Sequence, residues 1–493
     1  MMLLQQLIGG FADILTVYSI LAISIGVVTG ITVGALPGLS ATMSIAVLTP
    51  MTFLMSPQIG IAMLLGVYVG GIYGGSITAI LLRTPGTPSS IATTFDGYPL
   101  SQQGYAGKAL YLALVASIIG GLISAIVLIV LAPQIARVAL RFGPVEFFGL
   151  TLFGISIIAS VSGDNLIKGL VAGILGFLLS TVGMDGVTGV PRFTFGYTPL
   201  LSGFNLIPVL IGVFAVSEIL YLIRQRQTSV AAEGKVEKLA LSLAEFKGQL
   251  RNIGRSSLLG TFVGIVPGTG GGIASFMAYD LAKRRSKNPE LFGKGSLEGV
   301  ASAEAANNAT TGGALVPMLT LGIPGDPSTA VLMSAFMIQG LQPGPLLLQN
   351  EPRTIFSLFA GLLLANVLMF GFGMIGIRAF SKVVRIPIRI LAPTVLVLCF
   401  VGSYAIANSI LDVAVMLLMG GLGYLMRKFG FPGAPLVIGL ILGPINEAAL
   451  RRALSASRGN WMVFFENPIF LIFLALTIMS FVLPLVRKKL KPT

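Results

Sequence analysis

The chain contains no histidine and only one cysteine, Cys399, among its 493 residues. A single thiol cannot close an internal disulfide, and without histidine the commonest general base and a frequent metal ligand are missing. Zinc sites, haem ligation and Ser-His-Asp catalysis are therefore disfavoured. The phosphate-binding pattern Gly-x-x-x-x-Gly-Lys-Ser/Thr is absent too, so the sequence gives no sign of ATP hydrolysis.

Charge is also scarce. Charged residues make up 10% of the chain against 55% hydrophobic residues, and the mean hydropathy is +0.92. Residues 14–82 contain no Asp, Glu, Lys or Arg at all. Because a membrane-spanning helix needs about 20 apolar residues, this composition predicts a membrane protein that crosses the bilayer many times.

The few charges are unevenly distributed. The formal net charge is +14, and Lys and Arg gather in the stretches 224–255, 283–294, 378–389 and 487–491. Basic loops beside apolar spans follow the positive-inside rule for cytoplasmic segments, whereas a nucleic-acid binder carries its basic residues on a soluble surface. We therefore expect a lipid bilayer, and no nucleic acid, as partner. Residues 1–36 lack a basic start and a cleavage site, and we expect them to form a retained first span.

Gly and Pro divide the apolar sequence into segments of two lengths. The predicted membrane spans are 12–36, 57–82, 107–132, 147–162, 165–183, 204–223, 254–267, 355–377, 391–408, 410–426, 433–446 and 467–486. The shorter pieces, expected to be half-helices or hairpin arms, are 40–55, 87–100, 269–282, 301–322 and 327–340. The polar stretch 224–255 is expected to be a cytoplasmic linker with a short amphipathic helix near 239–250. The predicted fold class is an all-α polytopic membrane protein with re-entrant hairpins and broken helices.

Three motifs recur in the same order in the two halves of the chain. The pairs are Gly34–Ser40 with Gly264–Gly270, Pro85 with Pro324, and Pro208–Gly212 with Pro435–Gly439. Their offsets are 230, 239 and 227 residues. Offsets that differ by only about ten residues are expected of one duplicated unit with loop insertions. We place a first repeat at 1–223, the linker at 224–255, a second repeat at 256–450, and an appended span with a basic tail at 451–493.

Loop charges favour an inverted relation between the repeats. Loops 378–389 and 427–428 are basic, while the first-half counterparts, 137–141 and the stretch around Asp185, are weaker or acidic. If basic loops face the cytoplasm, equivalent loops lie on opposite sides, with the N-terminus outside and the linker inside. One basic cluster opposes this scheme because it would face outward: Arg451, Arg452 and Arg458.

Two Pro-Gly-x-Pro-Ser turns, at 84–90 and 323–329, interrupt nearly charge-free sequence at matching places in the repeats. In a membrane, backbone that cannot bond to itself persists only where protein buries it or where it lines a wet cavity. Paired breaks between repeats therefore point to the binding site of a secondary transporter.

These motifs also carry a family resemblance. The run 34–104, with Tyr73-Gly74-Gly75-Ser76, and the run 264–344, with Pro267–Gly272, resemble the large membrane subunit of tripartite tricarboxylate transporters. The resemblance covers essentially the whole chain. It implies a bacterial inner-membrane carrier, driven by a cation gradient and usually by sodium. It also implies two partners, a small membrane subunit like TctB and a periplasmic solute-binding protein like TctC, and no cofactor beyond the coupling ion.

A carboxylate substrate at the bilayer midplane needs backbone amides and helix N-termini as donors, since these avoid the cost of a buried Lys or Arg. The candidate substrate-binding residues lie at the breaks: Pro37, Gly38, Ser40, Thr87, Ser89, Ser90, Gly268, Thr269, Gly270, Gly271, Ser328 and Thr329. Carbonyl oxygens freed at the same breaks could coordinate sodium together with Asn307, Asn308 and Asp326. The carbon skeleton of the substrate stays open.

Each motif also has a plainer interpretation. Gly-rich turns often serve close helix packing, and the glycines at 70–71 and 74–75 are spaced for it. Asp326 is either a functional acid or a helix cap, and Glu304 is either functional or reaches the cytoplasmic surface. A passive anion channel and a membrane-embedded transferase stay open as functions, although scattered acids without histidine make a poor active site. The residues favour a carrier over an enzyme.

Overall fold

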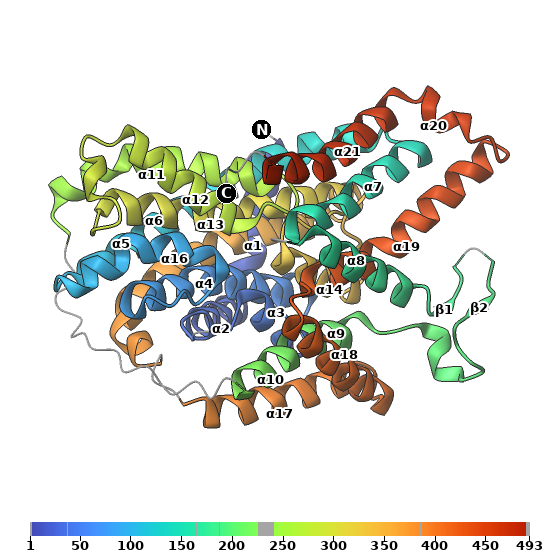
Figure 1. Cartoon of the computed structure of the whole chain (residues 1–493), viewed down its shortest axis with the longest axis horizontal. Coiled ribbons are helices and arrows are strands. Elements are labelled where there is room, and N and C mark those ends of the chain that lie inside the picture. Colours follow the sequence, from blue (N-terminus) through green and yellow to red (C-terminus); the bar gives the residue numbers. More distant parts are fainter. Residues whose placement is uncertain are drawn as a thin grey trace.

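The computed structural model describes residues 2–36, 38–162, 165–186, 188–224, 241–383 and 387–489. Figure 1 shows that this part of the chain is almost wholly helical, with one short strand pair, β1 (Gly183–Met184) and β2 (Pro191–Arg192). Within these ranges, 8 helices are long and apolar enough to cross a membrane. The predicted fold class, an all-α polytopic membrane protein, is confirmed.

In the first half of the chain, long helices alternate with short ones. After α1 (Met2–Ile14) come α2 (Val17–Gly34), α3 (Ala41–Thr52), α4 (Pro57–Leu82), η1 (Pro88–Ser90), α5 (Ile91–Gln102), α6 (Ala106–Ala139), α7 (Pro144–Val161), α8 (Leu166–Ser180), η2 (Thr198–Ser202), α9 (Leu206–Leu210), the π-helical η3 (Ile211–Val216) and α10 (Ser217–Arg224). Each Pro-Gly break thus separates a long helix from a shorter one.

The second half repeats this order. It contains α11 (Leu243–Ile265), α12 (Gly270–Arg285), η4 (Pro289–Leu291), α13 (Leu297–Leu321), α14 (Pro327–Ile338), α15 (Leu347–Asn350), α16 (Pro352–Val383), α17 (Ile388–Ala407), α18 (Ile410–Lys428) and α19 (Gly433–Ala456), followed by α20 (Met462–Glu466) and α21 (Pro468–Lys489). By position, α2, α3, α4 and α5 correspond to α11, α12, α13 and α14, and α6 corresponds to α16. The last two helices have no counterpart in the first half.

The half-helices α3, α5 and α14 are too short to cross a bilayer. The helices α3, α5 and α14 have 12 residues each, which at about 1.5 Å per residue is roughly 18 Å against a hydrocarbon core of about 30 Å. Local sequence explains where they begin: Ser40 accepts the Met43 N–H, and Asp326 accepts the Thr329 N–H. The predictions of half-helices at 40–55, 87–100 and 327–340 are confirmed.

Two helix predictions were wrong. The segment 301–322 is no hairpin arm, because α13 runs unbroken for 25 residues and is buried along nearly its whole length. Its many Ala, Thr, Asn and Gly residues give it a low hydropathy, and they are tolerated because α13 packs against other helices and not against lipid. The amphipathic helix near 239–250 is not a separate short element either, since α11 starts at Leu243 and continues to Ile265. Residues 225–240 of the predicted linker lie outside the described ranges.

Close glycine contacts join α2 to α4 and, at the equivalent positions, α11 to α13. A Cβ on Gly30 would overlap the carbonyl oxygen of Val67, and a Cβ on Gly260 would overlap the carbonyl oxygen of Ala306. Gly30 and Gly260 differ by 230, and Val67 and Ala306 by 239, which are the offsets of the sequence motifs. The same helix pair therefore occurs twice, as the duplication predicts.

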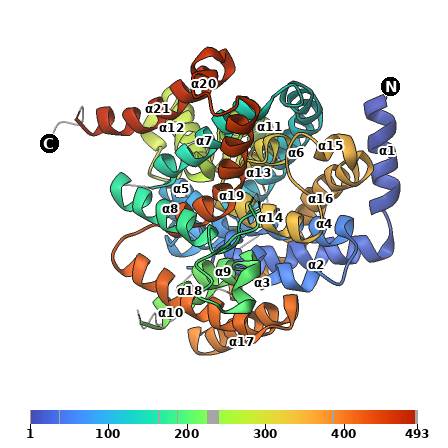
Figure 2. The same cartoon turned by 90° about the vertical axis from the view of Figure 1, so that its right-hand side faces the viewer.

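The two halves interlock. α6 packs against α13 of the other half, and its counterpart α16 packs against α4. In the same reciprocal way, α3 contacts α14 while α12 contacts η1 and α5, and α8 contacts α19 while α18 contacts α9, η3 and α10. Figure 2 shows α13 and α14 near the middle of the molecule, with α1, α17 and α21 at its edge. Neither half completes its core without the other.

Candidate functional site

Two pairs of half-helices bring the Pro-Gly breaks together, and each pair takes one helix from each half. In the first pair, the Thr42 hydroxyl of α3 lies 2.8 Å from the Ser328 hydroxyl of α14. In the second, a Cβ on Gly272 of α12 would lie 4.0 Å from the Cα of Ser89 in η1. By the offsets of 230 and 239, Gly272 is the counterpart of Thr42, and Ser89 is the counterpart of Ser328.

The helices of the second pair run side by side in the same direction. Beyond the Ser89–Gly272 contact, the ring of Phe95 lies 5.8 Å from that of Phe276 and 5.5 Å from that of Tyr279. Their N-termini, which carry partial positive charge, therefore begin at the same place.

The first pair forms a polar cluster that we call the Asp326 site, made of Thr42, Tyr68, Asp326, Ser328 and Thr329. The Tyr68 hydroxyl donates to Asp326 Oδ2 at 2.6 Å, and the Thr329 amide donates to Asp326 Oδ1 at 2.7 Å. The Thr329 hydroxyl also lies 2.9 Å from Oδ1. Both carboxylate oxygens of Asp326 thus have protein donors, and Asp326 acts as the N-cap of α14.

The second pair forms a cluster that we call the Asn307 site, made of Thr87, Ser89, Ser90, Gly271 and Asn307. The Thr87 hydroxyl lies 3.1 Å from that of Ser89 and 3.2 Å from that of Ser90. Asn307 on α13 is fully buried, yet neither its Oδ1 nor its Nδ2 has a hydrogen-bond partner. A buried amide without partners costs free energy, so this cluster is incomplete as it stands.

Several predicted site residues lie elsewhere. Ser40 caps α3, the Gly268 N–H donates to the Gly325 carbonyl oxygen at 2.8 Å, and the Thr269 hydroxyl donates to the Val266 carbonyl oxygen at 2.8 Å. Gly38 faces Leu222 of α10, and a Cβ on Gly270 would meet nothing within 4 Å. Gly38 and Gly268 both have the positive φ expected at these turns, +86° and +79°. Pro37 lies outside the described residues.

The structure gives the three predicted sodium ligands different neighbours. Asp326 bonds to Tyr68 and Thr329, Asn307 faces Gly271, and the Asn308 amide nitrogen lies 3.5 Å from Met369 Sδ on α16. Among the described residues, no three or more His, Cys, Asp or Glu side chains gather in a group that could hold a metal. A sodium site formed by all three side chains together stays a prediction.

Comparison with known families adds to this geometry. The model of the tripartite tricarboxylate transporter TctA family matches residues 20–438, which include both helix pairs. The chain belongs to the TctA family. The resemblance noted in the sequence is thereby confirmed, and the chain is a component of a transporter that crosses the membrane several times.

Two relatives of the chain come from Agrobacterium vitis. An uncharacterized 52.8 kDa protein in the TAR-I ttuC' 3' region is 39% identical over 490 residues, which is 99% of this chain and 98% of that protein. An uncharacterized protein in the TAR-II ttuC' 3' region is 39% identical over 233 residues, or 47% of this chain and 96% of that protein. No solved structure matches the chain.

Of two buried acids in this TctA-family chain, the sequence left one open between a functional and a surface position and did not point to the other. Glu304 does not reach the surface: it is fully buried, and the Thr93 and Ser117 hydroxyls donate to its carboxylate. Asp96 on α5 was not singled out. Its Oδ1 accepts the backbone N–H groups of Gly293, Gly295 and Ser296, and its Oδ2 accepts the Tyr279 hydroxyl. Only the fold brings this loop to Asp96, so no sequence signal marked it.

A cavity of about 700 Å³ lies along α5 and α12, beyond the Asn307 site. Its lining includes Arg83, Tyr98, Tyr279 and Lys283. Arg83 directly precedes the 84–90 turn and lies 5.9 Å from the Tyr98 ring centroid. The cavity thus joins two basic side chains to the helix pair whose N-termini form the Asn307 site.

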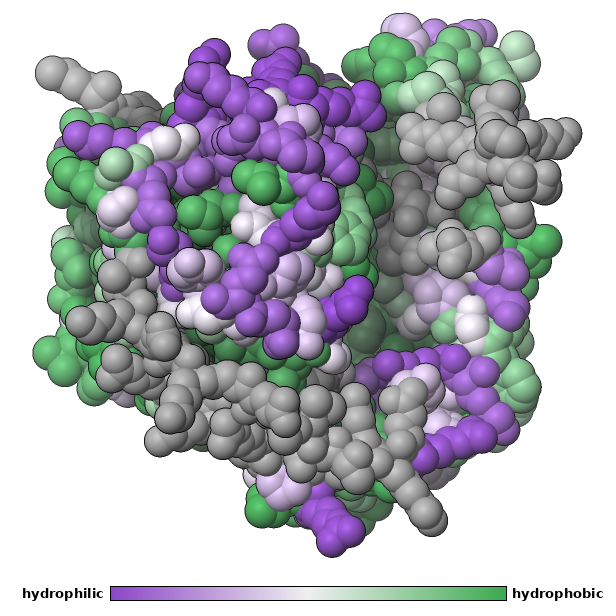
Figure 3. All heavy atoms as spheres, turned by 60° about the vertical axis from the view of Figure 1, so that its left-hand side comes forward, coloured by the Kyte–Doolittle hydropathy of each residue, from purple (hydrophilic) through white to green (hydrophobic). Residues whose placement is uncertain are grey.

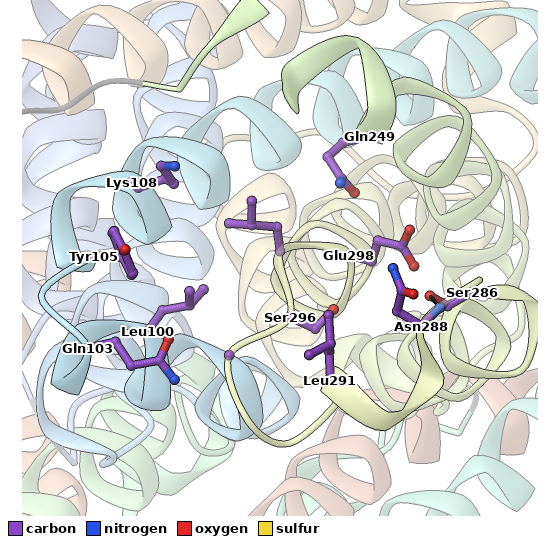
Figure 4. A pocket seen from close by; sticks show the side chains of 12 residues that line it. Leu100, Gln103, Tyr105, Lys108, Gln249, Ser286, Asn288, Leu291, Ser296 and Glu298 are labelled. Atoms are coloured by element: carbon purple, nitrogen blue, oxygen red, sulfur yellow. Dashed lines mark hydrogen bonds between the residues drawn. The ribbon is translucent and has the colours of Figure 1, made fainter. Parts of the chain in front are cut away.

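A second cavity, of about 360 Å³, lies between the two halves near the start of α11. In Figure 4, Tyr105 and Lys108 of the first half line one side, and Gln249 and Glu298 of the second half line another. The left-hand side of Figure 1, where α5 and α11 lie, comes forward in Figure 3; hydrophilic residues gather over its middle and upper part, and hydrophobic residues follow its edges. The TctA-family chain therefore presents a polar end here.

Proposed function

We propose that the chain is the large membrane subunit of a secondary transporter that imports a small carboxylate together with a cation. The substrate class is a tricarboxylate or a related di- or aromatic carboxylate, and the cation is sodium. The observation that supports this best is the pairing of half-helices: each pair combines one N-terminus from each half. Such paired breaks at a repeat interface are how secondary transporters bind ions and anions.

The proposal gives the two halves a role in alternating access. A site shared between repeats opens to one side or the other when one repeat moves against the other, and no chemistry on the substrate is required. The cavity beside Arg83 and Lys283 offers an anion a basic compartment along the C-terminal parts of α5 and α12, whose N-termini form the Asn307 site. We propose that it forms the cytoplasmic end of the path, because α12 leads into the basic stretch 283–294.

In this proposal the chain resides in a bacterial inner membrane with its linker inside. The arginine cluster that opposed this topology is partly neutralised. Arg192 and Arg451 both pair with Asp185 and Glu447, at distances of 2.5 to 3.1 Å. Two positive and two negative groups sum to no net charge, so the cluster counts less against an outward position.

A single cysteine tests this topology. Gly248 lies on an exposed turn of α11, and a side chain there meets nothing within 4 Å, whereas the native Cys399 is fully buried. We expect Gly248→Cys in intact cells to resist a membrane-impermeant maleimide until the inner membrane is permeabilised. The unmodified chain is the control. If the Gly248→Cys variant in intact cells is labelled more strongly than this control, the proposed topology is wrong.

Two partners complete the proposal: a small membrane subunit, and a periplasmic solute-binding protein that delivers the substrate. The function is tested by counterflow of labelled citrate, succinate and benzoate in vesicles containing all three components. A carrier accelerates exchange and saturates, a channel does not saturate comparably, and an enzyme alters the compound. Exchange no faster than in vesicles without this chain would contradict the proposal.

A further inference from the structure

The two related clusters differ in how their helix N-termini are satisfied. The Ser40 and Asp326 side chains accept backbone N–H groups at the starts of α3 and α14, and a capping box with Thr87 closes η1. The start of α12 has no such cap, because the Thr269 hydroxyl donates to the carbonyl oxygens of Val263 and Val266 at the end of α11. The first amides of this 16-residue helix therefore lack a side-chain acceptor.

The unpartnered Asn307 amide is aimed at this uncapped helix start. A Cβ on Gly271 would lie 2.7 Å from Asn307 Oδ1, 2.9 Å from Ser89 Cβ and 3.2 Å from Thr310 Oγ1. Any side chain at Gly271 would therefore overlap Asn307 and Ser89, so the start of α12 lies directly against the Asn307 amide. Two independent observations, an uncapped helix and a fully buried free amide, thus meet at one place.

The Asp326 site shows what fills the equivalent place in the other half. Under the offset of 239 residues, Tyr68 corresponds to Asn307, Asp326 to Thr87, and Thr329 to Ser90. In the Asp326 site the protein supplies its own carboxylate, which Tyr68 and Thr329 bind. In the Asn307 site the counterpart of that carboxylate is the neutral Thr87, while the donors around it remain.

We propose that the Asn307 site binds a carboxylate group of the transported anion, which takes the place that the Asp326 carboxylate occupies in the other half. The inference rests on the proposed function and assigns its substrate to one of the two clusters. Donors are the Asn307 amide, the hydroxyl of Ser89 and the first amides of α12, while the Ser90 hydroxyl donates to the Thr87 carbonyl oxygen. No Lys or Arg belongs to the cluster, so binding depends on hydrogen bonds and helix dipoles.

The helix dipoles decide between an anion and a cation at this place. The N-termini of α12 and of η1 with α5 both begin here, and N–H groups with partial positive charge repel sodium but stabilise a carboxylate. A sodium ion needs oxygen ligands at this point, and α12 presents amide N–H groups.

The test measures binding of citrate, succinate and acetate to the purified full chain by calorimetry and by the shift of the melting temperature. Thr87→Asp should supply an internal carboxylate, as in the other half. We expect it to raise the melting temperature and to weaken citrate binding at least tenfold. Asn307→Asp should weaken binding by a similar factor, because it places a negative charge against the ligand.

A matched glycine pair completes the test. Gly271→Ala places a methyl group 2.7 Å from Asn307 Oδ1 and so displaces the Asn307 amide, and it should weaken citrate binding at least tenfold. Gly272→Ala on the same turn meets nothing closer than 3.7 Å, and it should bind as the unmodified chain does. Equal binding by the Gly271 and Gly272 variants, or unchanged binding by Thr87→Asp, would overturn the assignment.

The outcomes separate this assignment from the proposed function. If the unmodified chain binds citrate but the variants bind equally well, the assignment fails and the transporter proposal stands. If the unmodified chain binds none of the three anions and counterflow is also absent, both fail. If Asn307→Asp tightens sodium binding, measured by sodium-dependent melting, the site holds the cation and the assignment is wrong.

Discussion

The two helix pairs have the same architecture and opposite electrostatic solutions. In the Asp326 site, a carboxylate from the chain satisfies the helix start, and every polar group in the cluster has a partner. In the Asn307 site, a threonine stands in its place, and a buried amide has no partner. The difference shows that two copies of one unit can treat the same helix start differently: one copy supplies its own carboxylate, and the other leaves a buried amide without a partner.

The largest expected effect tests whether the halves share their packing. Gly30→Val and Gly260→Val both force a side chain against a carbonyl oxygen of the facing helix. Overpacking of this kind costs about 1–3 kcal/mol and more when backbone must move, so we expect both variants to be lost from detergent extracts. The control is Gly254→Ala on α11, which meets nothing within 4 Å. A well-expressed Gly260 variant beside an absent Gly30 variant would break the equivalence of the two helix pairs.

The second prediction concerns a contact that only one half has. Asp96 holds the loop before α13, and its counterpart at the offset of 239 is Ala335. Asp96→Ala leaves the backbone N–H groups of Gly293, Gly295 and Ser296 and the Tyr279 hydroxyl without this acceptor, and we expect a loss of about 3 kcal/mol in the free energy of unfolding. Thermal unfolding in detergent measures it. Asp280→Ala, whose side chain is 58% exposed, is the control and should melt normally; a normal melting temperature for Asp96→Ala would contradict the interpretation.

The third prediction asks whether the charge of the Asp326 site also serves the cation. Asp326→Asn keeps one oxygen for the Thr329 amide, so abundance should change little. If the carboxylate contributes to sodium coupling, half-maximal uptake should need about tenfold more sodium, since a neutral oxygen binds a cation less tightly. Sodium-dependent uptake in vesicles measures this. An unchanged sodium dependence would reduce Asp326 to a helix cap.

The smallest effect lies at the polar end. Glu245 bonds to Lys108 of the first half, at 2.7 Å, and to Ser242, and these contacts lower its pKa from 4.5 to about 2. The contribution of Glu245 to the free energy of unfolding is therefore full above about pH 4.5 and is lost as the pH falls towards 2. Glu245→Gln should lose only about 0.5 kcal/mol at pH 7, because the pair is partly exposed. The difference in melting temperature between the unmodified chain and the Glu245→Gln variant should be smaller at pH 3 than at pH 7, and an equal difference at both pH values would exclude this linkage.

Local sequence was enough to locate the breaks and helix starts. The Pro-Gly turns and the capping residues Ser40 and Asp326 act within a few residues, so the half-helices could be predicted. The full length of α13 could not, because hydropathy assumes contact with lipid and α13 is surrounded by protein.

The sites were harder to predict than the helices. Asn307 was named as a sodium ligand, but its neighbours Gly271 and Ser89 come from different halves of the chain. Tyr68 was missed, although applying the offset of 239 residues to Asn307 points directly to it. Which polar groups lack a partner depends on contacts between halves, and pattern within one half contains no information about them.

The reciprocal contacts between halves also constrain the origin of the chain. A single ancestral repeat would have exposed the face of α6 that now packs on α13, and the face of α4 that now packs on α16. Two copies of that repeat could have covered these faces only as a symmetric dimer. Such a dimer would have had two identical half-helix clusters, so it could not have closed one without closing the other. Two copies within one chain do not have this constraint, so an aspartate can stand at 326 while a threonine stands at the equivalent position 87.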